Sequence, residues 1–315
     1  MFNRSFIKNA IDRSAENSVD RRRFLMAAGA AGLGVAGTAS LAGTASAQPD
    51  LLGGQPQQTG PSDAAILNFA LNLEYLEAEF YLRAVTGEGL PEGSVGGRGT
   101  PGAVDGGRQV RFETRAVRQY AHEIAADEKA HVDFLRGALG EAAVSRPSIN
   151  IDEAFTAAAM AAGLIEEGQQ FDPYANEENF LLAAYVFEDV GVTAYKGAAP
   201  LVDNKTFLEA AAGILAVEAY HASNIRTSLA AKGLEAPSVK ISDARDSLDG
   251  DTDLDQGVVL DGSLNIVPAD ANGIAFSRSA GQVLNIVYLT PEQATSGGFF
   301  PDGVNGSINQ SADSA

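Results

Sequence analysis

Apolar and polar residues alternate with a helical period along most of the chain between residues 62 and 232. Apolar side chains recur at every third or fourth position, which is typical of helices that bury one face. Four segments are long enough to be the main helices of a domain. They are residues 62–85, 109–139, 176–199 and 204–232.

The connections between these segments predict how the helices are arranged. A glycine-rich loop, residues 86–108, joins the first pair, and a short turn at Pro200 joins the second pair. A crossover, residues 140–175, links the two pairs and contains a shorter predicted helix over 151–165. Two helix pairs with one long crossover are the connectivity of a four-helix bundle. The sequence therefore predicts an all-α fold over residues 62–232.

The segments that flank the bundle have a different texture. Residues 48–61 are rich in Gln, Pro and Gly and are interpreted as a flexible leader. Residues 233–315 alternate short apolar runs with Asp and Gly, and we expect an irregular C-terminal extension there. One helix is predicted within it, over residues 280–289, because Ser279 and Gln282 are spaced as a capping box.

Residues 1–47 are predicted to be an export signal. Twin arginines, Arg21 and Arg22, precede a run of mostly Ala, Gly, Leu and Val that ends in an Ala-x-Ala motif at Ala47. This order resembles a twin-arginine (Tat) signal, which implies export of the folded protein to a periplasmic or extracellular location. The apolar run is shorter than the ~20 residues that a membrane span needs, so we expect no stable span after cleavage.

Composition narrows the chemistry. Lys and Arg number 22 against 41 Asp and Glu, for a net charge of −19, which argues against a nucleic-acid partner. The chain has no Cys, so thiolate metal sites, Cys nucleophiles and iron–sulfur clusters are excluded. Carboxylates and three histidines remain as the candidate polar chemistry.

Two histidines belong to Glu-x-x-His motifs, one on the second long helix and one on the fourth. The motifs are Glu128–His131 and Glu218–His221, and each lies on the apolar stripe of its helix. Residues three apart share a helical face, so each motif turns one carboxylate and one imidazole toward the core. The third histidine, His122, lies on the polar face, and we expect it to be solvated.

The first and third long helices carry a second repeated pattern, a Glu followed seven residues later by a Tyr. The pairs are Glu74 with Tyr81 and Glu188 with Tyr195, each two turns apart on one face. Glu77 is a rival for Glu74, but Tyr81 favours Glu74. The two halves of the bundle thus repeat each other, which predicts pseudo-two-fold symmetry.

Four carboxylates in one core repel one another and lose their hydration. Two divalent cations would balance them, with two imidazoles completing the ligand set. A protonated or solvated network without metal is the alternative that the residues leave open.

These motifs resemble the ferritin-like superfamily, and in particular its exported desiccation-related members. The resemblance rests on Asn72–Tyr81, on Glu128–His131 and on Gly297–Pro301 in the extension. It implies a ferritin-like bundle with two divalent ions, iron or manganese, that react with dioxygen or peroxide. Which carboxylates bridge the ions is open: Glu128 and Glu188, or Glu74 and Glu218. The implied metal ligands are Glu74, Glu128, His131, Glu188, Glu218 and His221.

Several functions remain compatible with this resemblance. A ferroxidase or a peroxide-removing enzyme with an external reductant is one, and a structural stress protein with a stabilising or empty site is another. Iron storage would require a closed cage, which the long extension disfavours, although a homo-oligomer is possible. Tyr81 and Tyr195 are candidate hydrogen-bond donors or redox-active phenols. We expect Asp127 on the surface, and the Asp-rich stretch 243–261 does not match an EF-hand loop.

Overall fold

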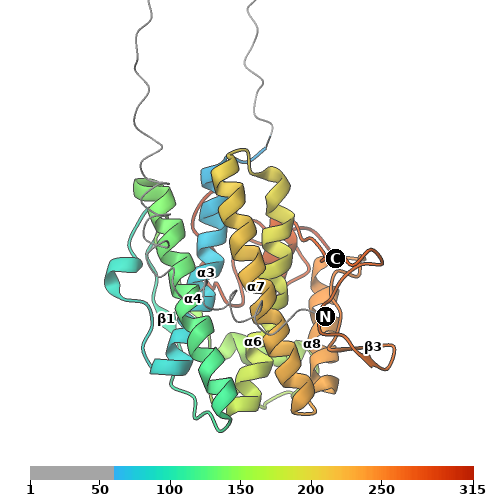
Figure 1. The fold of residues 1–315 in the computed structure, drawn as a ribbon. Coiled ribbons are helices and arrows are strands. Elements are labelled where there is room, and N and C mark those ends of the chain that lie inside the picture. The colour runs from blue at the N-terminus through green and yellow to red at the C-terminus, as the bar shows by residue number, and fades with distance from the viewer. Residues whose placement is uncertain (1–59) are drawn as a thin grey trace, which may run out of the picture. The chain divides into compact units, whose positions relative to one another are not determined.

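The computed structural model describes residues 60–315, and this part of the chain is mostly helical (Figure 1). The all-α prediction is confirmed, and the four predicted long helices are present. The second one begins at residue 115 instead of 109. The long helices are α3 (Asp63–Thr86), α4 (Arg115–Leu139), α6 (Glu177–Ala198) and α7 (Lys205–Ala231). The predicted signal, residues 1–47, lies outside the described residues.

Local sequence explains where these helices begin and end. The Ser62 hydroxyl accepts a hydrogen bond from the amide of Ala65, and Asn176 and Asn204 accept similar bonds at the starts of α6 and α7. Gly87 ends α3 with φ of 85°, a left-handed conformation that favours glycine. Within residues 60–315 no helix is both long and apolar enough to cross a membrane.

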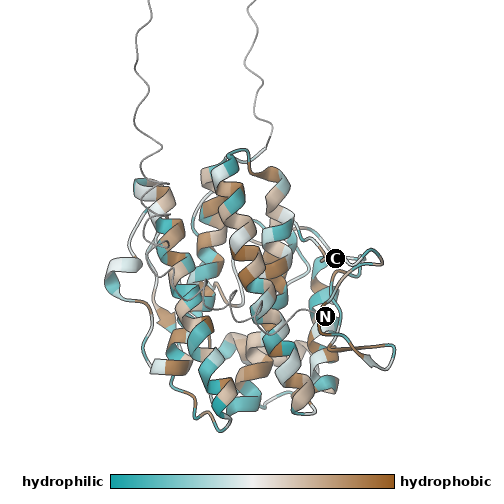
Figure 2. Cartoon of the chain, viewed as in Figure 1, coloured by the Kyte–Doolittle hydropathy of each residue, from teal (hydrophilic) through white to brown (hydrophobic). Residues whose placement is uncertain are grey.

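The helices pack as two antiparallel pairs, α3 with α4 and α6 with α7. The inner helices α3 and α6 are covered on several sides, and every residue of α6 from Phe180 to Tyr195 is buried. By contrast, α4 is buried along one stripe only, and hydrophilic residues cover its outer side (Figure 2). The difference arises because loops and the C-terminal extension cover α3 and α6.

Two short parallel strands tie the glycine-rich loop to the crossover, β1 (Val104–Asp105) to β2 (Ile149–Asn150). The crossover also holds α5 (Glu153–Ala161), which is shorter than the helix predicted there. Single 3-10 turns complete the connections. They are η1 (Glu92–Ser94), η2 (Gly140–Ala142) and η3 (Ala199–Leu201).

The C-terminal extension contains one more helix than the sequence predicted. Helix α8 (Glu235–Asp249) follows α7 almost directly, and an antiparallel hairpin joins β3 (Val259–Leu260) to β4 (Ser263–Leu264). Helix α9 (Ala280–Tyr288) matches the prediction, and its capping box between Ser279 and Gln282 is formed. The rest of the extension is irregular.

The end of the extension packs into the core of the bundle. Phe299 is fully buried, with its ring centroid 5.0 Å from that of Phe155 and 4.9 Å from that of Phe187. Gly298 has φ of 46°, and a Cβ there would lie 2.7 Å from the carbonyl oxygen of Val287. The Gly297–Pro301 segment therefore needs its glycines to bring Phe299 against α5 and α6.

A second set of buried side chains fastens the extension to α6 and α7. Three arginines and three aspartates, all nearly or fully buried, pair with one another, and we call them the Arg/Asp cluster. Arg245 on α8 pairs with Asp189 on α6 at 3.2 Å and with Asp255 at 2.7 Å. The members are Arg226, Arg245, Arg278, Asp189, Asp249 and Asp255.

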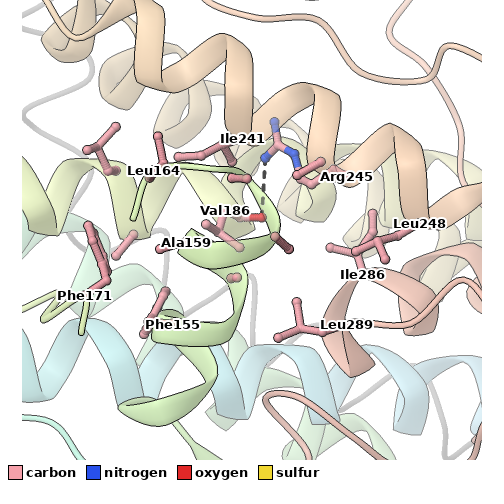
Figure 3. A pocket seen from close by; sticks show the side chains of 16 residues that line it. Phe155, Ala159, Leu164, Phe171, Val186, Ile241, Arg245, Leu248, Ile286 and Leu289 are labelled. Carbon is pink, nitrogen blue, oxygen red and sulfur yellow. Dashed lines mark hydrogen bonds between the residues drawn. The ribbon is translucent and has the colours of Figure 1, made fainter. Parts of the chain in front are cut away.

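An apolar pocket lies where α8 and α9 meet α5 and α6 (Figure 3). Ile241 and Leu248 of α8 line it together with Ile286 of α9, and the Arg245 guanidinium donates to the carbonyl oxygen of Val186 at 3.4 Å. The cavity volume is about 30 Å³, room for a water molecule or so. Its apolar lining identifies it as a packing gap and not as a catalytic site.

Candidate metal centre

The two Glu-x-x-His motifs turn toward the centre of the bundle from α4 and α7. Glu128 and Glu218 are fully buried, and His131 and His221 are nearly so. Apolar residues on the same stripe of each helix pack into the core, and they turn the motifs inward with them. His122, which precedes the first motif on α4, is exposed as predicted.

The inner helices each contribute one buried glutamate, and two tyrosines connect them crosswise. Tyr81 of α3 donates its phenolic hydrogen to Glu188 Oε1 of α6. Tyr195 of α6 donates in turn to Glu74 Oε1 of α3. Each glutamate thus has one oxygen held by a tyrosine from the opposite half, and its other oxygen faces an imidazole.

Glu128 lies between the two histidines. Its Oε2 is 3.5 Å from His131 Nδ1, and its Oε1 is 3.0 Å from His221 Nδ1. The ring centroids of the two histidines are 6.4 Å apart. One carboxylate therefore faces both imidazoles at once.

Three more glutamates complete the surroundings of the imidazoles. His131 Nδ1 lies 3.1 Å from Glu74 Oε2 and 3.6 Å from Glu218 Oε1. His221 Nδ1 lies 3.7 Å from Glu188 Oε2. The structure thus brings all six predicted residues into one buried group, which we call the Glu/His cluster: Glu74, Glu128, His131, Glu188, Glu218 and His221.

The ligand-type atoms of this cluster converge at two places. In the first, Glu74, Glu128, His131 and Glu218 each offer an atom within 4.8 Å of the others, and in the second Glu188, Glu218 and His221 do so. Glu218 belongs to both groups, and Glu128 faces both histidines. The geometry thus favours Glu128 and Glu218 as the shared carboxylates, a pairing different from both that the sequence left open.

Unpartnered buried atoms show that the cluster fits metal ions. Both carboxylate oxygens of Glu128 and of Glu218 lack a hydrogen-bond partner, as do Glu188 Oε2 and His221 Nδ1. Buried polar atoms are normally paired, and a group of unpaired acceptors needs an explanation. Carboxylate oxygens and imidazole nitrogens are the ligands that iron and manganese accept in proteins.

Burial and mutual repulsion shift the pKa values of the carboxylates. Burial raises the pKa of Glu74 to about 7 and that of Glu188 to about 8. Burial, followed by the charge of Glu128, raises the pKa of Glu218 well above its ordinary value. Burial acts on Glu128 in the same direction, but the two neighbouring histidines outweigh it and hold its pKa below the ordinary value.

The histidines respond to the same charges with the opposite sign. Burial lowers their pKa, but the surrounding carboxylates more than reverse this effect. Among the carboxylates, Glu74 has the largest effect on His131, and together with Glu128 it raises the pKa of this histidine to about 11. Glu188 has the same role for His221, whose pKa rises to about 10. Without a cation, the cluster therefore holds protons in its place.

Asp127 supports one histidine from outside the cluster. Its Oδ2 lies 3.3 Å from His221 Nε2, and its side chain is 45% exposed. A proton on Nε2 shared with this carboxylate leaves the lone pair of Nδ1 directed at Glu128 and Glu188. The Asp127 side chain is partly exposed, in line with its predicted surface position, and its carboxylate also contacts His221, a contact that the sequence analysis did not predict.

Glu77 is a fifth buried carboxylate, beside the four of the cluster. The structure places Glu74 and not Glu77 against His131, and Glu77 belongs to neither convergent group. A Cβ added at Gly191 would lie 2.5 Å from Glu218 Oε2 and 3.6 Å from Glu77 Oε1, so this glycine leaves room for both carboxylates. Burial and the charge of Glu128 raise the pKa of Glu77 well above its ordinary value.

A four-helix bundle with paired Glu-x-x-His motifs and two further glutamates has the same side-chain arrangement as the ligand sets of ferritin-like metal proteins. The Ferritin-like domain model matches residues 62–231, and the chain belongs to this family.

Two curated relatives are similar over most of their length. Ferritin-like catalase Nec2 of Nesocodon mauritianus is 29% identical over 275 residues, which cover 78% of this chain and 85% of the relative. Desiccation-related protein PCC13-62 of Craterostigma plantagineum is 30% identical over 268 residues, covering 78% and 83%. No solved structure matches the chain. The predicted resemblance to ferritin-like and desiccation-related proteins is confirmed.

Proposed function

We propose that the Glu/His cluster holds two divalent ions of iron or manganese and that the loaded protein removes hydrogen peroxide. The observation that carries this proposal is the group of unpartnered oxygens of Glu128 and Glu218 next to two imidazoles. Two divalent cations balance four buried carboxylates, which would otherwise be costly to ionise together. The name of one relative, a ferritin-like catalase, supports peroxide as the substrate.

Disproportionation of peroxide balances without another reductant. One molecule is oxidised to dioxygen while a second is reduced to two molecules of water. Bound iron or manganese would supply the redox chemistry by taking up and returning the two electrons. Oxidation of ferrous iron at the same cluster is the related reaction that would need an external electron acceptor such as dioxygen.

The chain's own residues have the task of holding the ligands in place. Tyr81 and Tyr195 fix one oxygen of Glu188 and Glu74, so the second oxygen of each, which faces an imidazole, would be the one to bind a cation. Asp127, 3.3 Å from His221 Nε2, would hold a proton on that nitrogen and keep Nδ1 available as a ligand. Ile225 and other apolar side chains of the core keep bulk water out, which strengthens electrostatic interactions inside.

The test is oxygen release from peroxide by protein loaded with manganese or with iron. We expect one dioxygen per two peroxides from wild type and none from a Glu128→Ala/His131→Ala double variant. His122→Ala is the matched control, because His122 is an exposed histidine on the same helix. A wild-type protein that carries two ions and releases no oxygen would contradict the proposed reaction.

A structural role is the second candidate, and the position of the cluster supports it. All four long helices contribute a ligand-type side chain, so bound ions would hold the bundle together at its centre. The relative named desiccation-related protein supports a role in stress. This alternative predicts a large fall in melting temperature when metal is removed, and no turnover.

A further inference from the structure

An arginine follows each motif histidine at the same distance. The sequence reads Glu128-x-x-His131-x4-Arg136 on α4 and Glu218-x-x-His221-x4-Arg226 on α7. Five residues are about one and a half helical turns, so neither arginine points into the Glu/His cluster. Since the other parts of the two halves repeat each other, the partners of these arginines can be compared directly.

Both arginines bind the residue that follows the glutamate of the neighbouring inner helix. Arg136 Nη1 donates to the hydroxyl of Tyr75 at 2.5 Å, and Tyr75 follows Glu74 on α3. Arg226 Nη1 donates to Asp189 Oδ2 at 2.7 Å, and Asp189 follows Glu188 on α6. Each contact therefore joins the two helices of one half beside a pair of ligand-type residues.

Both arginines also bind backbone carbonyl groups of the irregular segment that covers their half. Arg136 donates to the carbonyl oxygen of Gly96 in the glycine-rich loop at 2.6 Å. Arg226 donates to those of Gln256, Gly257 and Asn265 in the C-terminal extension, at 2.6 to 3.0 Å. The covering segments are unrelated in sequence, yet each is fastened through the equivalent arginine.

We propose that Arg136 and Arg226 are equivalent positioning residues, each of which sets the spacing between the two helices whose side chains hold one metal ion. This inference rests on the proposed metal centre. Metal ligands have to be held within about 0.5 Å of their working positions. A guanidinium group has several N–H donors, so it can bind a side chain of the neighbouring helix and the covering segment at the same time. These hydrogen bonds would restrain the distance between the two helices.

The two arginines do not contribute equally. Arg226 is fully buried and faces a charged partner, whereas Arg136 is half-buried and faces a neutral phenol. Loss of Arg226 leaves Asp189 buried with Arg245 as its remaining ion pair. Replacing the arginine should therefore weaken metal binding more in the half formed by α6 and α7 than in the half formed by α3 and α4.

Measuring manganese binding distinguishes a role of Arg226 in positioning the metal ligands from a role in stability alone. We would load wild type, Arg226→Met and Arg226→Lys with manganese, then measure ions per chain, the affinity of each site and the paramagnetic resonance spectrum. Wild type is expected to bind two ions that are magnetically coupled. Arg226→Met should bind the second ion roughly 10- to 100-fold more weakly and show the spectrum of isolated ions. Arg226→Lys should recover part of the affinity, because it keeps the charge.

Arg278→Met is the matched control. Arg278 is as deeply buried and belongs to the same Arg/Asp cluster, but it binds Asp249, Asp255 and Thr193 and no neighbour of a ligand-type residue. It should lower the melting temperature without changing the two affinities. If Arg226→Met also lowers only the melting temperature and leaves both ions coupled, the inference is wrong.

Arg136→Met provides a second test, which stands even if Arg226→Met does not fold. Its half-buried position makes folding of the variant the expected result, and binding at the Glu74 and His131 site should weaken. Unchanged affinity there would overturn the equivalence of the two arginines. A wild-type protein that binds no metal would instead overturn the proposed function, so the two failures are distinguishable.

Discussion

Two buried polar clusters meet on helix α6, and they differ in whether the chain alone balances their charges. Glu188 belongs to the Glu/His cluster, and its neighbour Asp189 belongs to the Arg/Asp cluster. In the Arg/Asp cluster, three arginines face three aspartates, and every member forms at least one ion pair. In the Glu/His cluster, four carboxylates face two imidazoles, and neither oxygen of Glu128 or of Glu218 has a partner. In the Arg/Asp cluster, each aspartate keeps at least one paired oxygen, although Oδ1 of Asp189 and of Asp249 is unpartnered.

The difference in charge balance predicts a structural role for the Arg/Asp cluster and ion binding for the Glu/His cluster. A charge-balanced network can be buried without bound ions, because each charged side chain has an oppositely charged neighbour. A cluster with more carboxylates than positive charges cannot be buried fully ionised, so the Glu/His cluster has to take up protons or cations from solution. Substitutions in the two clusters should therefore change stability in opposite directions.

The largest effect is expected from Asp255→Ala in the Arg/Asp cluster. Asp255 accepts from both Arg245 and Arg278, so its removal leaves two buried arginines short of a partner. We expect the free energy of unfolding to fall by about 3–5 kcal/mol, with or without metal. Denaturant unfolding measures this, with Asp251→Ala as an exposed control in the same segment. A loss of about 1 kcal/mol or less would show that the network is not a structural unit.

Glu218→Gln should have the opposite signature. Both oxygens of Glu218 are unpartnered, and the neighbouring carboxylates repel its charge. The neutral amide relieves this repulsion, so the metal-free protein should be as stable as wild type or more stable, while metal affinity falls at least ~10-fold. Melting curves recorded with a chelator and with manganese test both parts. A marked loss of stability in the chelator would mean that Glu218, like the members of the Arg/Asp cluster, stabilises the metal-free fold, which contradicts the proposed difference.

Stability of the metal-free protein should fall as pH rises. Glu74 and Glu188 have pKa values raised from 4.5 to about 7 and about 8, and His131 and His221 have values raised from 6.5 to about 11 and about 10. Each group binds more protons in the folded than in the unfolded state between its two pKa values, about pH 5 to 8 for the glutamates and about pH 6 to 11 for the histidines. Stability should therefore decrease with pH over the combined range.

Metal binding should reverse this dependence, because the cation displaces the same protons. The measurement is the melting temperature of chelator-treated and manganese-loaded protein over that pH range. We expect the two curves to diverge as pH rises. Parallel curves would mean that the cation and the protons do not compete for the same cluster.

The smallest effect is expected from Asp127→Asn. Asp127 is partly exposed and holds His221 through the outer nitrogen, so its loss weakens the support of a ligand and not the ligand itself. We expect about a 10-fold loss of affinity at one of the two ions. Titration with manganese detects it, and Asp133→Asn, an exposed aspartate on the same helix, is the control. An equal loss at both ions would contradict the assignment of Asp127 to the His221 half.

The sequence predicted the four long helices and the inward direction of the six cluster residues, because both follow from helical spacing within single segments. The capping box of α9 was also predicted correctly, since Ser279 and Gln282 are close in sequence. That these residues bind metal stays a prediction. What spacing could not provide was the crosswise pairing of Tyr81 and Tyr195, which depends on how α3 and α6 cross.

Helix α8 and its position were not predicted because they depend on ion pairs between residues far apart in sequence. Helix α8 is polar and weakly periodic, and Arg245 ties it to Asp189 on α6, far away in sequence. One signal was available but not used: helices buried on all sides are apolar all round. The nearly continuous apolar run of α6 from Phe180 could have predicted that the extension covers it.

The central claim, that the Glu/His cluster binds two divalent cations, is tested most directly by the metal content of the protein as purified from its producing cells. Mass spectrometry of wild type and of Glu128→Ala/His131→Ala would count iron and manganese per chain. We predict about two ions per wild-type chain and a loss of both in the double variant. A wild-type chain that contains no metal and takes up none from excess manganese would contradict the claim, and the cluster would then be a protonated network.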